Sequence, residues 1–194
     1  MKRVVPEGAV LIPSHAKRVF HGVLFDVYQW EQELFDGTIT TYEMLRRPDT
    51  VVILGLQDDK LIMVEEQQAG RPTYLRFPGG RVEKGEDWFE AAKREMLEET
   101  GLRFNQWRLV NVEQVETKLE WFVAVFLAYD IAGQELPHHD AGEKVTVMLK
   151  TLDEVKRAIG SDGNLVLKHA KPFFDKIDSI EQLKQLSAFK GREI

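Results

Sequence analysis

The sequence predicts a mixed α/β fold in which β-strands surround one glutamate-rich helix, with an antiparallel β-lobe ahead of the main domain. Three features support this prediction. Segments with β-strand composition lie on both sides of a single, strongly acidic helical pattern. Gly, Pro and Asp separate these segments at short intervals, as they do in β-hairpins. Helical periodicity returns only near the C-terminus, so the order differs from a regular alternation of parallel strands and helices.

The composition is that of a folded globular protein and excludes several classes of function. The chain has 194 residues, 43% hydrophobic and 30% charged, enough for one sizeable core. A formal net charge of -6 argues against a general nucleic-acid binder, and the absence of cysteine excludes thiolate zinc sites and cysteine nucleophiles. The N-terminus lacks the apolar region of a signal peptide, and the longest apolar run, 121–129, is about half a membrane span. We therefore expect a soluble, cytoplasmic protein without a membrane partner.

Seven segments have the composition of β-strands. They cover residues 18–33, 38–47, 51–56, 61–66, 108–116, 121–130 and 144–151. Asp36-Gly37 and Asp58-Asp59 are turn signals, so the first four segments form two hairpins. A loop rich in Gly and Pro, 69–80, leads into a helix over 86–101. Helices are predicted at the end of the chain over 152–159, 166–174 and 179–189, with Pro172 interrupting the middle one.

The helix over 86–101 carries the most informative side chains. Glu95, Glu98 and Glu99 are spaced i, i+3 and i+4, so their carboxylates share one face, and Arg94 can neutralise only part of that charge. Hard divalent cations bind clustered oxygen ligands of this kind. The Gly79-Gly80 turn lets the backbone approach closely, because no Cβ intervenes. By spacing alone, a solvated acidic helix face remains the alternative.

The full pattern around these glutamates is more specific than their spacing. It consists of Gly80, Glu86, Arg94-Glu95-Met96, Glu98-Glu99 and Gly101-Leu102, separated by five, seven, one and one residues. At every specified position it resembles the signature of the Nudix hydrolases. The resemblance implies an α/β/α sandwich with a mixed sheet. It also implies an enzyme that uses Mg²⁺ or Mn²⁺ to hydrolyse a nucleoside diphosphate linked to another moiety.

The resemblance also implies roles for individual residues by their position. The implied metal ligands are the Gly79 carbonyl, Glu95, Glu98, Glu99 and Glu143. The implied catalytic residues are Arg94, which orients the carboxylates, with Glu98, Glu99 and Glu143. Glu143 matches an acidic group that binds metal or activates water, and Asp140 is a weaker candidate for that role. Glu86 holds the loop, and His138-His139 is interpreted as ordinary polar loop.

A closer resemblance, over about residues 18–160, is to the ADP-ribose pyrophosphatases. It rests on FHGVLFDVYQWEQELFDGTITTYEMLRRPDTVVIL, LIMVEEQQ and DAGEKVTVMLKTLDEV. In those enzymes the N-terminal sheet exchanges with a second subunit, which implies a homodimer. It also divides this chain into a β-subdomain over 1–47 and a hydrolase domain over 48–194. The chain departs from that group at Gln68 and Arg76, and it lacks a proline near 116–118.

The implied substrate is a nucleoside diphosphate sugar, most of all ADP-ribose, cleaved to AMP and ribose 5-phosphate. The alternatives are a GDP-hexose, a dinucleotide such as NADH or FAD, and a non-catalytic nucleotide sensor. Candidate substrate-binding residues are Arg46, Arg71 and Arg76 for phosphates, and Tyr28 and Trp30 for stacking on a base. Arg47, Arg81, Phe25 and Tyr74 are further candidates of the same two kinds.

Overall fold

Two sheets form the framework of the computed structural model, which describes residues 3–68, 70, 72–138, 143–160 and 170–194. The strands are β1 (Val4–Val5), β2 (Lys17–His21), β3 (Asp26–Glu33), β4 (Ile39–Arg46), β5 (Thr50–Gln57), β6 (Lys60–Gln68), β7 (Tyr74–Arg76), β8 (Leu102–Glu116), β9 (Leu119–Gln134), β10 (Glu143–Lys150) and β11 (Arg192–Glu193). The larger sheet has the order β10-β6-β5-β9-β4-β3-β2, with β7 added to β6 and β8 to β9. Because β5 and β4 run parallel to β9 and the other pairs are antiparallel, the sheet is mixed, as predicted.

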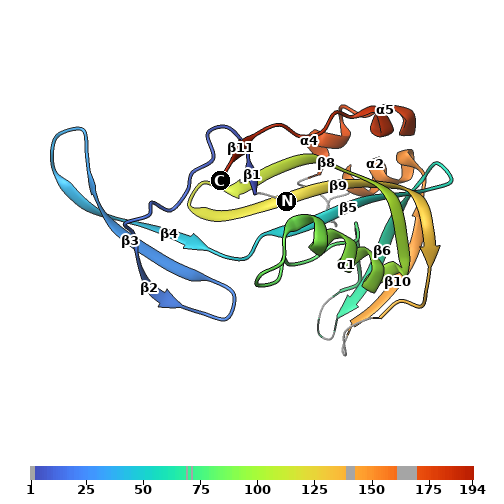
Figure 1. The fold of residues 1–194 in the computed structure, drawn as a ribbon, viewed down its shortest axis with the longest axis horizontal. Helices are drawn as coiled ribbons and strands as arrows, with labels where there is room; N and C mark the ends of the chain where they lie inside the picture. Colours follow the sequence, from blue (N-terminus) through green and yellow to red (C-terminus); the bar gives the residue numbers. More distant parts are fainter. Residues whose placement is uncertain (1–2, 69, 71, 139–142, 161–169) are drawn as a thin grey trace.

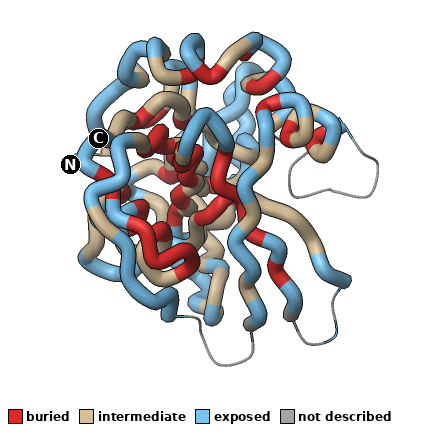
Figure 2. The backbone as a smooth tube through the Cα atoms, turned by 90° about the vertical axis from the view of Figure 1, so that its right-hand side faces the viewer, coloured by how far each residue is buried: buried red, intermediate tan, exposed pale blue. Residues whose placement is uncertain are grey.

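Helices cover both faces of this sheet, which confirms the predicted α/β/α sandwich. They are α1 (Trp88–Thr100), α2 (Leu152–Gly160), α4 (Lys171–Phe174) and α5 (Ile180–Gln185). Neighbouring strand residues point to opposite layers. Ile53 joins the core cluster under α1, whereas Leu54 joins the cluster under the C-terminal helices. Figure 1 shows α1 on one side of the sheet and α2, α4 and α5 on the other, and Figure 2 shows the buried residues concentrated between them.

Most predicted elements are present. The strands β1, β7 and β11 were not predicted, and α5 ends at Gln185 rather than at residue 189. The segment 18–33 is two strands, β2 and β3, because the chain turns back at Gly22, whose N–H donates to the carbonyl of Phe25. Strands β8 and β9 are longer than predicted and contain register shifts that allow them to curl. Of the predicted helix 166–174, residues 166–169 lie outside the described residues. Pro172 lies in the first turn of α4, where its missing N–H has no helical partner.

Strands β2, β3 and β4 form an antiparallel arm that projects from the rest of the molecule (Figure 1). Its turn at Asp36-Gly37 is the predicted one. The arm joins the main sheet only where Leu45 and Arg46 pair with Leu119 and Glu120. Strand β1 instead pairs with β11 and buries Val5 in the core under α1. No helix in the described part of the chain is long and apolar enough to cross a membrane.

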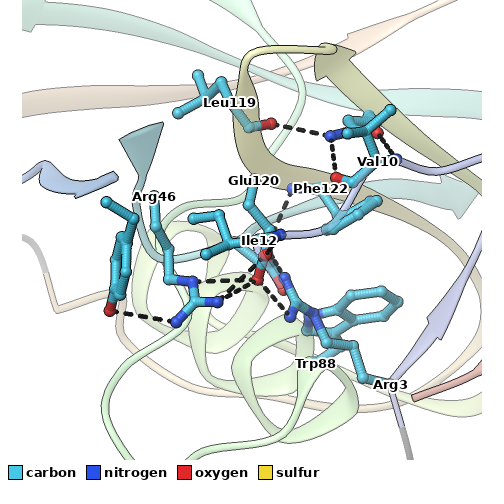
Figure 3. A network of polar contacts seen from close by, with 11 residues as sticks. Arg3, Val10, Ile12, Arg46, Trp88, Leu119, Glu120 and Phe122 are labelled. Carbon is cyan, nitrogen blue, oxygen red and sulfur yellow. Dashed lines mark hydrogen bonds and ion pairs between the residues drawn. The ribbon is translucent and has the colours of Figure 1, made fainter. Parts of the chain in front are cut away.

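A network of buried charges ties the arm and the N-terminal segment to the core (Figure 3). Glu120, only 3% exposed, accepts hydrogen bonds from the Ile12 N–H at 2.7 Å, from Arg3 at 3.4 Å and from Arg46 at 3.0 and 3.1 Å. Asp49 in turn binds Arg3 at 2.8 and 2.9 Å and accepts the indole N–H of Trp88. These contacts connect segments that lie far apart in the sequence.

The replacement Glu120→Gln is expected to lower the free energy of unfolding by about 2 kcal/mol, because it removes the charge of a buried carboxylate that two arginines share. Urea denaturation of both proteins would measure this loss. The control is Glu116→Gln, an exposed glutamate on the adjacent hairpin turn, which should change stability little. Equal stability of the two variants would contradict the assigned role of Glu120.

Candidate active site

The helix α1 begins and ends where its capping residues require. The Asp87 carboxylate accepts hydrogen bonds from the N–H groups of Phe89 and Glu90 at 2.8 and 3.0 Å, and Glu90 reaches back to complete a capping box. Gly101 ends the helix with a left-handed φ of 72°. The helix therefore spans a slightly shorter segment than predicted, and it presents its glutamates toward the preceding glycine turn.

The Gly79-Gly80 turn packs directly between β5 and α1. The N–H of Val51 donates to the Gly80 carbonyl at 2.9 Å, so the turn lies alongside the strand. Gly79 has a φ of 144°, and a Cβ there would come within 2.1 Å of the Val51 carbonyl oxygen. A Cβ on Gly80 would come within 2.4 Å of the Glu95 carboxylate. Only two glycines permit this close approach of loop, strand and helix.

Arg94 organises the glutamates on the exposed side of the helix. Its guanidinium binds both oxygens of Glu86 at 2.9 and 3.0 Å, and one of its nitrogens donates to Glu95 at 2.8 Å and to Glu98 at 3.0 Å. It also donates to the Arg81 carbonyl at 3.0 Å. Arg94 thus contacts three glutamates and the loop before the helix, and the orienting role of Arg94 and the loop-holding role of Glu86 stay predictions.

Glu99 lies deeper and is held by a different arginine. Arg76 binds both of its carboxylate oxygens, at 2.7 and 3.0 Å, and the Gly79 N–H donates to it at 3.2 Å. The same guanidinium forms a close ion pair with Glu66, which is 2% exposed. Arg76 therefore contacts the site that the sequence predicts for the metal, rather than projecting into open solvent as a free phosphate-binding group.

Burial makes two of these carboxylates costly to ionise. It raises the pKa of Glu95 to about 7, against the opposing effect of Arg94. Burial also raises the pKa of Glu99, while hydrogen bonds and charge from Arg76 lower it. A divalent cation would offset this cost, and the donors are the hard oxygens that Mg²⁺ and Mn²⁺ prefer. Within the described residues no three Asp, Glu or His groups are placed to hold a metal ion together, and Arg76 and Arg94 hold the carboxylates in two separate groups. The donor types fit the metal, and the close approach of Gly80 to Glu95 places this carboxylate beside the glycine turn.

Several predicted residues lie elsewhere or cannot be placed. Arg71, His139 and Asp140 lie outside the described residues, and of Glu143 only the backbone is described, at the start of β10 opposite Gln68. Arg46 binds Glu120 and lies over the Tyr28 ring, 4.7 Å from its centroid. Trp30 is on the arm, packed against Tyr42.

Arg47 and Trp121 form a contact that the sequence did not single out. The Arg47 guanidinium lies 4.2 Å from the Trp121 ring centroid and 5.8 Å from that of Phe25. Its Nε is buried and has no hydrogen-bond partner among the described residues. Burial, and then the charge of Arg81, lower the pKa of Arg47 below its ordinary value. The sequence identified Arg47 as a candidate phosphate-binding residue at the end of a predicted strand, and Trp121 could be recognised only as the start of an apolar run.

Two cavities lie on either side of this contact. The first, about 710 Å³ and open, lies between the arm and the loop before α1, and is lined by Arg46, Arg47, His21, Asp26, Glu86 and Trp88 among others. The second, about 330 Å³ and mostly apolar, lies on the opposite face of β5. Its lining includes Arg76, Gly79, Asn111, Trp121, Phe173 and Phe174. The glycine turn therefore contributes directly to the apolar cavity.

Alanine at the two glycines is expected to have unequal effects. Gly79→Ala should lower the free energy of unfolding by more than about 1 kcal/mol, because its Cβ meets a backbone carbonyl at a positive φ. Gly80→Ala should cost less, because the Glu95 carboxylate it meets ends a flexible side chain and can rotate away. Urea titrations of the two variants give the comparison, and a larger loss for Gly80→Ala would contradict the packing described.

Comparisons with known proteins agree with this geometry. The NUDIX domain pattern matches residues 46–169, which is more than half of the chain. The chain is 30% identical to the ADP-ribose pyrophosphatase of Bacillus subtilis (strain 168) over 151 residues, 75% of this chain and 80% of that protein. It is 36% identical to the ADP compounds hydrolase NudE of Escherichia coli (strain K12) over 85 residues, 42% of this chain and 46% of that protein.

A solved structure has the same fold. The crystal structure of an ADP compounds hydrolase superposes with a TM-score of 0.68 at 24% identity, covering 88% of this chain and 92% of the other. Together with the domain match and the Bacillus relative, this confirms the resemblance that the signature predicted. The chain therefore belongs to the Nudix hydrolase family and is a Nudix pyrophosphohydrolase.

Proposed function

We propose that the protein hydrolyses the diphosphate bond of nucleoside diphosphate sugars with Mg²⁺ or Mn²⁺, and that ADP-ribose, cleaved to AMP and ribose 5-phosphate, is its first substrate. The similarity to the ADP-ribose pyrophosphatase of Bacillus subtilis supports the choice of ADP-ribose. The observation that carries the proposal is a pair of arginines, Arg47 and Arg81, that lie next to the glycine turn without an anionic partner.

The two arginines differ from the others near the site. Arg46, Arg76 and Arg94 each bind a carboxylate, whereas no carboxylate pairs with Arg47 or Arg81 in the described part of the chain. Arg81 directly follows the glycine turn and pairs with Thr50, whose hydroxyl accepts the indole N–H of Trp121. Two neighbouring guanidinium groups repel each other, and an anion between them relieves the repulsion. A diphosphate has the charge and the several oxygens to do so.

Two cavities, the larger lined by Arg47 and the apolar one by its neighbour Trp121, suit the two halves of such a substrate. The apolar cavity offers aromatic rings and the Asn111 carboxamide, which has no side-chain partner among the described residues. A nucleobase has two apolar faces and a hydrogen-bonding edge, so it fits this lining. The larger cavity, which is the more polar of the two, suits the sugar. In this arrangement the diphosphate lies over the glycine turn, beside the glutamate helix.

Individual side chains then have separate roles in hydrolysis. Glu95, Glu98 and Glu99, with the Gly79 carbonyl, would hold the cation, while Arg94 keeps the carboxylates aligned. When bound, the divalent cation neutralises diphosphate charge and lowers the pKa of a coordinated water. We assign acceptance of the water's proton to Glu143, which the chain places at the start of β10.

A second copy of the chain is the proposed partner of the arm. Large apolar side chains are exposed along β2, β3, β4 and their turns: Val19, Phe20, Val23, Phe35 and Ile39 are 53–114% exposed. Such a patch on a projecting arm favours burial in a homodimer, as the resemblance implies.

Equilibrium sedimentation of the parent protein is expected to give the mass of a dimer. The double variant Phe20→Ser/Val23→Ser is expected to give the mass of a monomer, because it removes apolar side chains from the patch. A parent protein that sediments as a monomer would contradict the proposed homodimer.

Incubation of the protein with ADP-ribose and Mg²⁺ should release AMP and ribose 5-phosphate, identified by mass spectrometry. Glu99→Gln should reduce turnover by several orders of magnitude, because it removes a charged ligand, while circular dichroism shows an intact fold. If the protein cleaves a GDP-hexose, NADH or FAD and leaves ADP-ribose intact, the cleaved compound replaces ADP-ribose as the assigned substrate. Binding of all of them without any turnover would support the sensor hypothesis instead.

Arg47→Ala and Arg81→Ala are each expected to raise KM for ADP-ribose about 10- to 100-fold, the loss of one charge-assisted contact to phosphate. Steady-state kinetics on the full chain would measure it. Arg103→Ala is the matched control, because Arg103 is an exposed arginine on β8 that forms an ion pair with Glu135. An unchanged KM in both Arg47→Ala and Arg81→Ala would contradict diphosphate binding at this pair.

A further inference from the structure

Arg76 is more deeply buried than Arg94, the other arginine that binds glutamates of the site. Its side chain is only 13% exposed and lies between two carboxylates, Glu66 and Glu99, that are themselves nearly buried. One terminal nitrogen donates to Glu99 at 2.7 Å. The other donates to Glu99 at 3.0 Å, to the Phe77 carbonyl at 3.1 Å and to the Gly79 carbonyl at 3.2 Å. The guanidinium thus has a partner in every direction.

Two of these partners are the oxygens proposed for the metal. Both carboxylate oxygens of Glu99 and the carbonyl of Gly79 are engaged by the same guanidinium. A divalent cation at these oxygens would lie within a few Å of a fixed positive charge. Like charges at that separation, away from bulk water, repel strongly. Arg76 and a cation therefore compete for one set of oxygen atoms.

Glu66 provides a second position for the arginine. It pairs with the Nε side of the guanidinium, opposite the nitrogens that contact Glu99. Glu66 has no place among the proposed metal ligands. When contacts to Glu99 are given up, the ion pair with Glu66 keeps the positive charge inside the protein, where an unpaired buried guanidinium would be costly.

We propose that Arg76 is a built-in cation that competes with the divalent metal for Glu99 and the Gly79 carbonyl, and that metal binding moves its contacts toward Glu66. Arg76 thereby lowers the affinity of the site for metal and stabilises the protein when metal is scarce. This inference rests on the proposed metal role of Glu99. Arg76 is a positioning residue, and it does not contact the substrate's reacting atoms.

A purely orienting role for Arg76 predicts the opposite change in metal affinity. If Arg76 merely orients Glu99 as a ligand, its removal would loosen the carboxylate and weaken metal binding. Metal affinity therefore separates competition from orientation, and it does so without any measurement of turnover.

The test is Mn²⁺ binding to the full-length chain, measured from the electron paramagnetic resonance signal of free Mn²⁺. Arg76→Gln is expected to bind Mn²⁺ at least about tenfold more tightly than the parent, from the loss of a nearby like charge. In EDTA the variant should have a lower Tm than the parent, and saturating Mn²⁺ should raise its Tm by more. Arg76→Lys, which keeps the charge, should retain weak binding, and it serves as a second variant if Arg76→Gln fails to fold.

Arg108→Gln is the matched control. Arg108 is a half-buried arginine on β8 that donates to the carbonyls of Lys184 and Leu186 at 2.9 and 2.6 Å, away from the glutamate helix. Its loss should lower the Tm and leave Mn²⁺ affinity unchanged. Unchanged or weaker Mn²⁺ binding by Arg76→Gln would overturn the inference while the metal site stands. If neither the parent nor Arg76→Gln binds Mn²⁺, or if Glu99→Gln binds it as tightly as the parent, the proposed metal site fails together with the inference.

Discussion

The close approach of the Gly79-Gly80 turn to β5 and α1 is the constraint on which the site depends. A single Cβ on Gly79 would collide with the backbone of β5, and one on Gly80 would collide with the Glu95 carboxylate. Because both positions lack side chains, the loop lies against strand and helix at once. The turn's carbonyls, the helix carboxylates and the arginine that follows the turn therefore come from different segments but share one small region.

Charge is distributed unevenly across that region. On the side of α1, two arginines pair with four glutamates, Arg94 with Glu86, Glu95 and Glu98, and Arg76 with Glu99, and they balance only part of the negative charge. On the side of Trp121, Arg47 and Arg81 lie close together without carboxylates in the described part of the chain. The first group suits a cation and the second suits an anion. Such opposed groups, a few residues from a common turn, are well arranged for a metal complex of a diphosphate.

The local features of the fold could be predicted from sequence, and the long-range ones could not. The helix, its closing glycine and the two hairpin turns follow from short patterns that act within a few residues. The partner of Arg46 is Glu120, which lies on a distant strand, so no local pattern separates Arg46 from its neighbour Arg47. Arg76 is a similar case, because its ion pair with Glu99 forms only when loop and helix have packed. Position along the chain therefore indicates which arginines lie near the site, but it does not reveal which of them already bind a carboxylate.

The pairing of β1 with β11 has a consequence for how the chain folds. These two-residue strands join the first and last described segments, so their contact closes a loop of nearly the whole chain (Figure 1). Closing so long a loop costs entropy, and in return the contact gains a few hydrogen bonds and the burial of one core side chain, Val5. We expect it to form last during folding and to open first, with both ends leaving the body together. Amide hydrogen exchange should then show Val5 and Arg192 opening at the same low free energy, well below that of the β5–β9 core.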